Sequence, residues 1–81
     1  MKFVYSQRCL DSLRGAPPEV RAAFAKQLGF LESNLRHPSL RAKKYDESIG
    51  LWQARVNRDW RFYFTLEGDE YHLHEIKAHP K

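Results

Sequence analysis

Several features that would assign a sequence to a specialised class are missing from this chain. Its 81 residues include one cysteine, Cys9, so an intrachain disulfide cannot form, and a lone thiol is typical of a reducing compartment. No apolar run approaches the ~20 residues that a membrane-spanning helix needs, and residues 1–6 lack the apolar core of a signal peptide. The four glycines form no phosphate-binding loop. We therefore expect one cytoplasmic domain, residues 1–81, with no membrane segment and no small-molecule cofactor.

The composition is that of a globular protein with an excess of positive charge. Aromatic residues make up 14% of the chain, which is too many for a disordered protein, and the net charge is +4. Residues 35–61 contain seven basic and three acidic side chains, whereas residues 62–81 are net acidic. A basic surface of this kind favours a polyanionic partner such as nucleic acid, although a solvated charged face would have the same composition.

The first part of the chain predicts a strand and two helices. Lys2–Ser6 is a short strand, and Ser6 is suited to cap a helix over Gln7–Leu13 that Gly15 ends in a left-handed conformation. Pro18 fits the first turn of a second helix, where its missing N–H is harmless. An apolar stripe at helical spacing identifies that helix as a packing element, and it consists of Val20, Phe24, Leu28, Leu31 and Leu35.

Beyond this helix, the apolar pattern changes from a helical to an alternating period. Residues 38–50 have no apolar period and predict a loop that exposes two lysines and a tyrosine, namely Lys43, Lys44 and Tyr45. Leu51–Asn57 and Trp60–Leu66 alternate apolar with polar residues, as half-buried strands do. The short Asn57–Asp59 segment between them predicts a hairpin.

A third strand completes an antiparallel meander. Gly68 allows the positive φ that the preceding turn needs, and Tyr71–Ile76 follows it. Leu73 and Ile76 fall on opposite phases of this strand, which a β-bulge would explain. The predicted fold is α+β, with an N-terminal strand, two helices and a three-stranded meander whose one face the helices cover.

The hairpin predicts a basic surface on the face of the sheet away from the helices. If Phe62 and Phe64 face the helices, Arg55, Arg61 and Tyr63 face outward, and Arg58 lies at the tip. Two guanidinium groups suit a phosphodiester, because arginine binds phosphate through a planar fork. The phenol of Tyr63 would add stacking to an unpaired base. The alternative is a solvated face with cross-strand ion pairs.

The histidines and the cysteine offer different chemistry. His72 and His74 share a face of a strand, but no third ligand has a convincing spacing, so we expect no metal site. His79 follows the last strand and precedes a proline, where it would exchange protons near neutral pH or simply be part of a frayed end. Cys9 has no matching catalytic partners and is expected to be a small buried residue.

The order of these elements resembles a known family. The hairpin segment Arg55–Phe64, followed by an acidic turn and the ending Glu75–Lys81, is similar to the RelE/ParE toxins of bacterial type II toxin–antitoxin systems. The segment His37–Lys44 resembles the lysine-containing loop that precedes their hairpin. The resemblance spans essentially the whole chain. It implies the RelE-like fold and, in the RelE branch, cleavage of messenger RNA on the ribosome by 2′-hydroxyl attack without a metal ion.

The resemblance also implies roles for individual residues. The YafQ branch fits better than the RelE branch, because its Asp-Trp pair matches Asp59 and Trp60 and its C-terminal catalytic histidine matches His79. His79 or Asp59 would then carry the proton, while Arg55 and Arg61 stabilise charge on the phosphate. The implied RNA-binding residues are Lys43, Lys44, Arg58, Tyr63 and Lys81.

Partners and alternatives follow from the same resemblance. An antitoxin protein is expected to bind and silence the chain, and the ribosome and messenger RNA are the expected targets. A ParE-like inhibitor of DNA gyrase is an alternative, as is an inactive RNA-binding module, because one fold can carry several functions.

Overall fold

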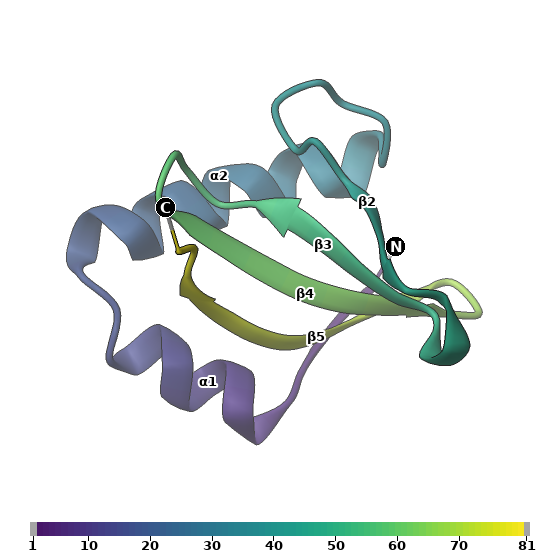
Figure 1. Cartoon of the computed structure of the whole chain (residues 1–81), viewed down its shortest axis with the longest axis horizontal. Coiled ribbons are helices and arrows are strands. Elements are labelled where there is room, and N and C mark those ends of the chain that lie inside the picture. Colours follow the sequence, from purple (N-terminus) through teal and green to yellow (C-terminus); the bar gives the residue numbers. More distant parts are fainter. Residues whose placement is uncertain (1, 81) are drawn as a thin grey trace.

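The structure is a computed structural model that describes residues 2–80, with two α-helices against one five-stranded sheet (Figure 1). The elements in chain order are β1 (Lys2–Tyr5), α1 (Gln7–Arg14), α2 (Pro18–Ser33), β2 (Lys43–Asp46), the 3₁₀ helix η1 (Glu47–Ile49), β3 (Leu51–Arg55), β4 (Trp60–Glu67) and β5 (Glu70–Ala78). The sheet order is β1-β5-β4-β3-β2, with β1 parallel to β5 and all other pairs antiparallel. The α+β prediction is confirmed, with one more strand than expected.

The start of the first helix is held by its predicted cap. The side chain of Ser6 accepts a hydrogen bond from the Cys9 N–H at 3.0 Å and donates one to the His74 carbonyl at 2.9 Å, so the cap also attaches α1 to β5. Gly15 ends the helix with φ −84°, so the predicted left-handed conformation is wrong. Its N–H bonds back to the Asp11 and Leu13 carbonyls, which closes the last turn with right-handed geometry.

The second helix carries the core. It begins at Pro18 as predicted, and the apolar stripe is buried from Val20 to Leu31, while Leu35 lies beyond the helix end and is half-buried. These residues join Cys9 and the inner side chains of the sheet in one core cluster. Within residues 2–80, neither α-helix combines the length and the apolar composition that spanning a bilayer requires.

The segment predicted as a loop contains the edge strand β2. Lys43 pairs with Gln53 and Lys44 with Trp52, although every side chain of β2 is exposed. The loop prediction was wrong because this strand has no buried face, and it is held by main-chain pairing, which leaves no apolar alternation in the sequence. Its side chains alternate between the two faces of the sheet, so Lys43 and Lys44 lie on opposite faces.

The predicted turn and bulge of the meander are both present. Gly68 has φ +64° in the turn between β4 and β5. Tyr63 pairs with Glu75 and Phe64 with Leu73, so His74 is the extra residue of a bulge. The bulge resets the alternation of β5, which is why Leu73 and Ile76 are both buried.

Candidate nucleic-acid interface

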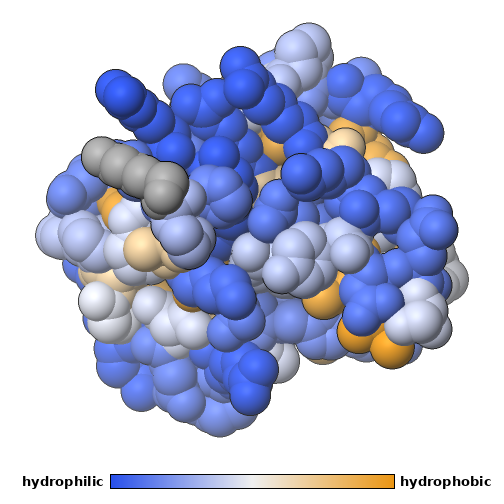
Figure 2. All heavy atoms as spheres, viewed as in Figure 1, coloured by the Kyte–Doolittle hydropathy of each residue, from blue (hydrophilic) through white to orange (hydrophobic). Residues whose placement is uncertain are grey.

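The face of the sheet opposite α2, called the outer face, carries a basic cavity of about 230 Å³. Six residues from the loop before β2, from β2, β3 and β4, and from the C-terminal tail line it, namely Arg41, Lys43, Gln53, Arg55, Arg61 and His79. No carboxylate of residues 2–80 is part of this lining. Figure 2 is viewed onto this face, and hydrophilic residues cover most of it. We call this site the outer cavity.

The two predicted arginines lie side by side in the outer cavity. Arg55 on β3 is the register partner of Arg61 on β4, as the hairpin predicted. Burial is the main cause that lowers the pKa of Arg61, and the positive charges of Arg55 and Arg41 lower it further. Arginine stays protonated at neutral pH despite such shifts. The crowding of like charges therefore favours an anion in this cavity.

Arg61 is fixed in place by the hairpin turn itself. Its Nη1 donates to the carbonyls of Asn57 at 2.8 Å, Trp60 at 3.0 Å and Arg58 at 3.3 Å. The side chain of Asn57 shapes the same turn by accepting from the N–H groups of Asp59 and Trp60. Nε and Nη2 of Arg61 make no hydrogen bond within residues 2–80, so this edge of the fork is available to a ligand.

Arg55 is held through its backbone instead. Its N–H donates to the Leu40 carbonyl at 2.7 Å, and its carbonyl accepts from Nε2 of Gln27 at 2.7 Å. Leu40 is completely buried and Gln27 is 4% exposed, so both contacts are shielded from water. Within residues 2–80 the guanidinium group of Arg55 makes no hydrogen bond or ion pair.

Sequence reasoning missed Arg41. This arginine has φ +47°, a left-handed conformation that a residue other than glycine adopts at a cost. It directly follows Leu40, whose carbonyl accepts the Arg55 N–H, and this contact brings the two arginines to the same cavity. The signal in the sequence was weak, because Arg41 is one of several cations in a segment without periodicity.

His79 lines the outer cavity, while Asp59 lies outside it. The His79 N–H donates to the Asp59 carbonyl at 2.7 Å, and the preceding Ala78 pairs with Trp60. The tail is therefore attached to the hairpin through residue 79, which argues against a frayed end. Asp59 is exposed at the hairpin tip, and its charge raises the pKa of Arg61.

Tyr63 lies on the outer face but is covered. The side chain is 6% exposed, and its hydroxyl accepts a hydrogen bond from Gln53 Nε2 at 3.0 Å. The ring of Tyr45 packs edge-on against it with 5.1 Å between the ring centroids, and Lys77 Nζ lies 5.1 Å from the centroid of the Tyr63 ring. A base has no room to stack on it. Tyr45 is 56% exposed beside a hollow of about 440 Å³ that Ile49 also lines. The small hydrophobic group at the right of Figure 2 lies over this η1 end of the sheet.

The sequence matches no family model and no curated protein, but its structure matches solved ones. A YoeB/ParE toxin from Agrobacterium tumefaciens superposes with a TM-score of 0.82 at 13% identity, covering 99% of this chain and 100% of that one. The RelE of a Methanococcus jannaschii RelB–RelE complex gives 0.78 at 13% identity, covering 93% and 88%. YafQ from E. coli gives 0.68 at 17% identity, covering 95% and 91%. The chain has the RelE/ParE toxin fold.

The other RNA-binding residues that the RelE/ParE resemblance implied do not all lie in the outer cavity. Lys43 lines the outer cavity, but Lys44 lies on the opposite face, with Nζ 5.2 Å from the ring centroid of Trp52. Arg58 is exposed and lines a different cavity, next to α2. Lys81 lies outside the described residues. The outer cavity therefore brings together Arg55, Arg61, His79 and Lys43 of the predicted set.

His72 and Cys9, the remaining residues that the sequence offered for metal binding or nucleophilic chemistry, have structural roles in this RelE/ParE fold. His72 contacts Glu70 at 3.0 Å and Glu67 at 3.4 Å, and within residues 2–80 no group of three or more potential metal ligands is present. Cys9 is completely buried, and burial raises the pKa of its thiol to about 11. A thiol of such high pKa is a poor nucleophile at neutral pH, which agrees with the prediction of a buried apolar role.

Proposed function

We propose that this protein is the toxin of a toxin–antitoxin pair and that it cleaves messenger RNA on the ribosome. The observation that carries the proposal is the outer cavity, where Arg55, Arg61, Arg41 and Lys43 surround one space next to His79. Four cations beside an imidazole, which can accept a proton on one ring nitrogen and donate one from the other, match the needs of phosphodiester transfer. The proposed place of action is the cytoplasm, where ribosomes translate.

The proposed reaction uses the RNA, the side chains of the outer cavity and, as an alternative proton carrier, Asp59 at the neighbouring hairpin tip. The 2′-hydroxyl of one nucleotide attacks the adjacent phosphorus, a P–O2′ bond forms and the P–O5′ bond breaks. A 2′,3′-cyclic phosphate and a 5′-hydroxyl result. His79 takes the proton of the 2′-hydroxyl and gives a proton to the leaving 5′-oxygen, and Asp59, whose carbonyl accepts from the His79 N–H, is the second candidate for this role of proton carrier. Arg55 and Arg61 stabilise the extra negative charge on the phosphoryl oxygens.

The surroundings of the cavity supply binding rather than chemistry. Lys43 contributes charge for the phosphate backbone, and Tyr45 offers an exposed ring for an unpaired base in place of Tyr63. Lys81, which follows His79 by two positions, is proposed to add a further contact.

An antitoxin is the proposed regulatory partner. Solved structures with the same fold include a RelB–RelE antitoxin–toxin complex and a YoeB–YefM toxin–antitoxin complex from Staphylococcus aureus. A cationic cavity that must be silenced in the producing cell suits a partner with an acidic segment.

The test is induction of the chain alone in bacterial cells, with primer extension across a translated reporter. Growth arrest with new 5′ ends inside the translated region, absent when translation is blocked, is the expected result. His79→Gln should lose these ends, and Arg36→Ala should keep them, because Arg36 is exposed outside the cavity. Growth arrest with intact messenger RNA would instead favour gyrase inhibition, and the absence of both would favour an inactive RNA-binding module.

A further inference from the structure

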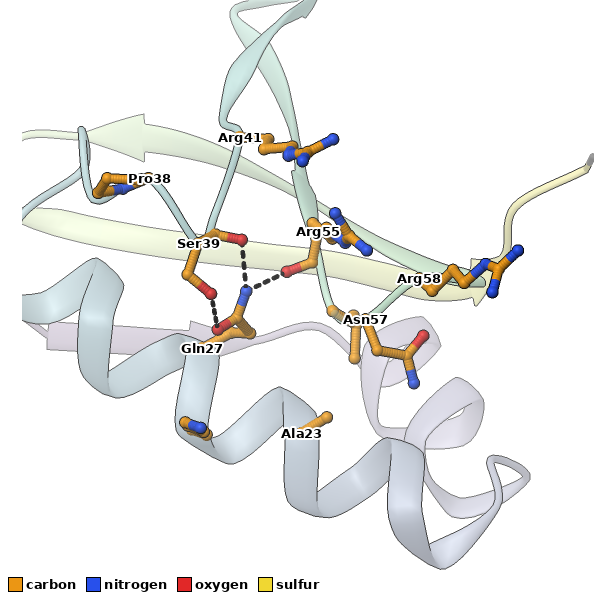
Figure 3. A pocket seen from close by; sticks show the side chains of 10 residues that line it. Ala23, Gln27, Pro38, Ser39, Arg41, Arg55, Asn57 and Arg58 are labelled. Atoms are coloured by element: carbon orange, nitrogen blue, oxygen red, sulfur yellow. Dashed lines mark hydrogen bonds between the residues drawn. The ribbon is translucent and has the colours of Figure 1, made fainter.

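A second basic cavity lies between α2 and the β3–β4 hairpin (Figure 3). It has a volume of about 420 Å³, and its cations are Lys26, Arg41, Arg55 and Arg58. No carboxylate of residues 2–80 lines it. We call it the α2 cavity. Because like charges repel one another and no acid of residues 2–80 is part of the lining, this cavity favours an anionic ligand.

The α2 cavity and the outer cavity are neighbours that share two walls. Arg41 and Arg55 line both of them. In Figure 3 these two arginines lie together above Gln27, and Arg58 lies further along the hairpin. A basic surface therefore continues from the outer face, around the end of β3, to α2.

One buried amide fixes the walls of the α2 cavity. Gln27 on α2 donates through Nε2 to the carbonyls of Ser39 at 3.0 Å and Arg55 at 2.7 Å, and its Oε1 accepts from the Ser39 hydroxyl at 3.0 Å (Figure 3). The helix, the loop before β2 and the end of β3 are thus held together by fully satisfied hydrogen bonds. The cations are presented by a preformed scaffold, which lowers the ordering cost of binding.

The cations around both cavities make no ion pair with an acid of residues 2–80. The ion pairs of residues 2–80 involve Lys2, Arg14, Lys77 and His72, and none involves a residue of either cavity's cationic lining. The electrostatic repulsion among these cations is reduced when a polyanion from outside the protein binds to them.

We propose that the α2 cavity is a second phosphate subsite, which binds the same RNA strand that reacts in the outer cavity. This inference rests on the proposed function and specifies its substrate as single-stranded RNA longer than the scissile dinucleotide. A strand that follows the surface around β3 must bend sharply, which an unpaired chain does far more readily than a stiff duplex. Lys26 and Arg58 are the residues that belong to this subsite alone.

The test compares the Lys26→Ala, Arg58→Ala double variant with the unmodified chain. Fluorescence anisotropy would measure the binding of two 2′-O-methyl RNA probes, a dinucleotide and an oligonucleotide of about eight nucleotides, called the octamer. Neither probe can be cleaved, because the attacking 2′-hydroxyl is blocked. We expect the double variant to bind the octamer about tenfold or more weakly and to lower the salt slope of log K by about 1.4, because each lost phosphate contact removes about 0.7. Dinucleotide binding should not change.

The control is Arg36→Ala, which removes an exposed cation outside both cavities. The subsite is refuted if the double variant binds the octamer normally, if it weakens the dinucleotide equally, or if Arg36→Ala has the same effect. The proposal would also be overturned if a poly-glutamate peptide displaced the labelled octamer from the protein as effectively as unlabelled RNA does. The binding test does not depend on cleavage. If the protein binds the probes as expected but cuts no messenger RNA, the proposed function is wrong while the RNA-binding subsite is supported.

Discussion

The two faces of the sheet hold their side chains in different ways. On the face toward the helices, Phe62, Phe64 and Ile76 are at most 2% exposed and are positioned by packing. On the outer face, Gln53 and Tyr63 are 6% exposed, yet they and Arg61 are positioned by hydrogen bonds. Alternate residues of the same strands therefore serve stability on one face and the proposed chemistry on the other, and the outer face is an ordered polar layer.

The largest expected effect is on the face toward the helices. Phe64 is completely buried and contacts the rings of Trp52, Phe62 and Tyr71. We expect Phe64→Ala to lower the free energy of unfolding by about 3–5 kcal/mol, measured by urea denaturation, because it leaves a cavity. Leu66→Ala on the same strand, where the side chain is 38% exposed, should cost less than about 1 kcal/mol. Equal costs would contradict the division between core and surface.

On the outer face, Arg55 and Arg61 are expected to contribute equally to activity but differently to stability. Arg55→Ala should lower RNA cleavage by about 10²–10³-fold, since a donor to the phosphate is lost, with a change in unfolding free energy below about 0.5 kcal/mol. Arg61→Ala should lose as much activity and also about 1 kcal/mol of stability, because its hydrogen bonds to the hairpin carbonyls are removed. Thermal unfolding and a cleavage assay separate the two. Unfolding of Arg55→Ala would show that Arg55 is structural.

The buried thiol gives the core a pH dependence. Burial raises the pKa of Cys9 from 9.0 to about 11, so the folded state favours the neutral thiol. This contribution, about 3 kcal/mol for a shift of two pKa units, is fully present below about pH 9 and is lost as the pH rises from about 9 towards 11. Urea denaturation at about pH 8 and pH 10.5 should show a larger loss for the unmodified chain than for Cys9→Ala. Equal losses would mean that Cys9 becomes accessible.

The smallest effect is expected at the exposed aromatic ring. Tyr45→Ala should weaken binding of single-stranded RNA by about 1 kcal/mol, the lower end for stacking on one base, while Tyr45→Phe should bind normally. Anisotropy with uncleavable RNA measures both. Tyr63→Phe tests the other half of the comparison, because it removes the hydroxyl that accepts from Gln53 and should affect stability rather than RNA affinity. A stronger loss of affinity in Tyr63→Phe than in Tyr45→Ala would reverse our assignment.

Much of the fold was readable because its signals are local. The cap at Ser6, the stripe of α2, the hairpin and the positive φ of Gly68 each depend on residues a few positions apart. The adjacency of Arg55 and Arg61 belongs to this group, since a tight turn determines the register of its two strands. The left-handed end predicted at Gly15 was wrong, because the last turn of α1 closes with right-handed geometry.

The rest of the candidate site depended on contacts between distant segments. Arg41 reaches the outer cavity because Leu40 bonds to Arg55, and β2 exists only through its pairing with β3. Tyr63 was expected to be open, but the side chains of β2 and β5 cover it. None of these contacts leaves a period or a motif in the sequence.

The two helices, the meander and the basic hairpin follow from the amino-acid sequence alone, because apolar periodicity and turn chemistry act over a few residues. Three features could be known only from the tertiary structure: which cations share a cavity, which aromatic ring is exposed, and how the buried Gln27 links α2 to Arg55. The physical reason is that side-chain burial and long-range hydrogen bonds depend on the register and packing of segments up to tens of residues apart.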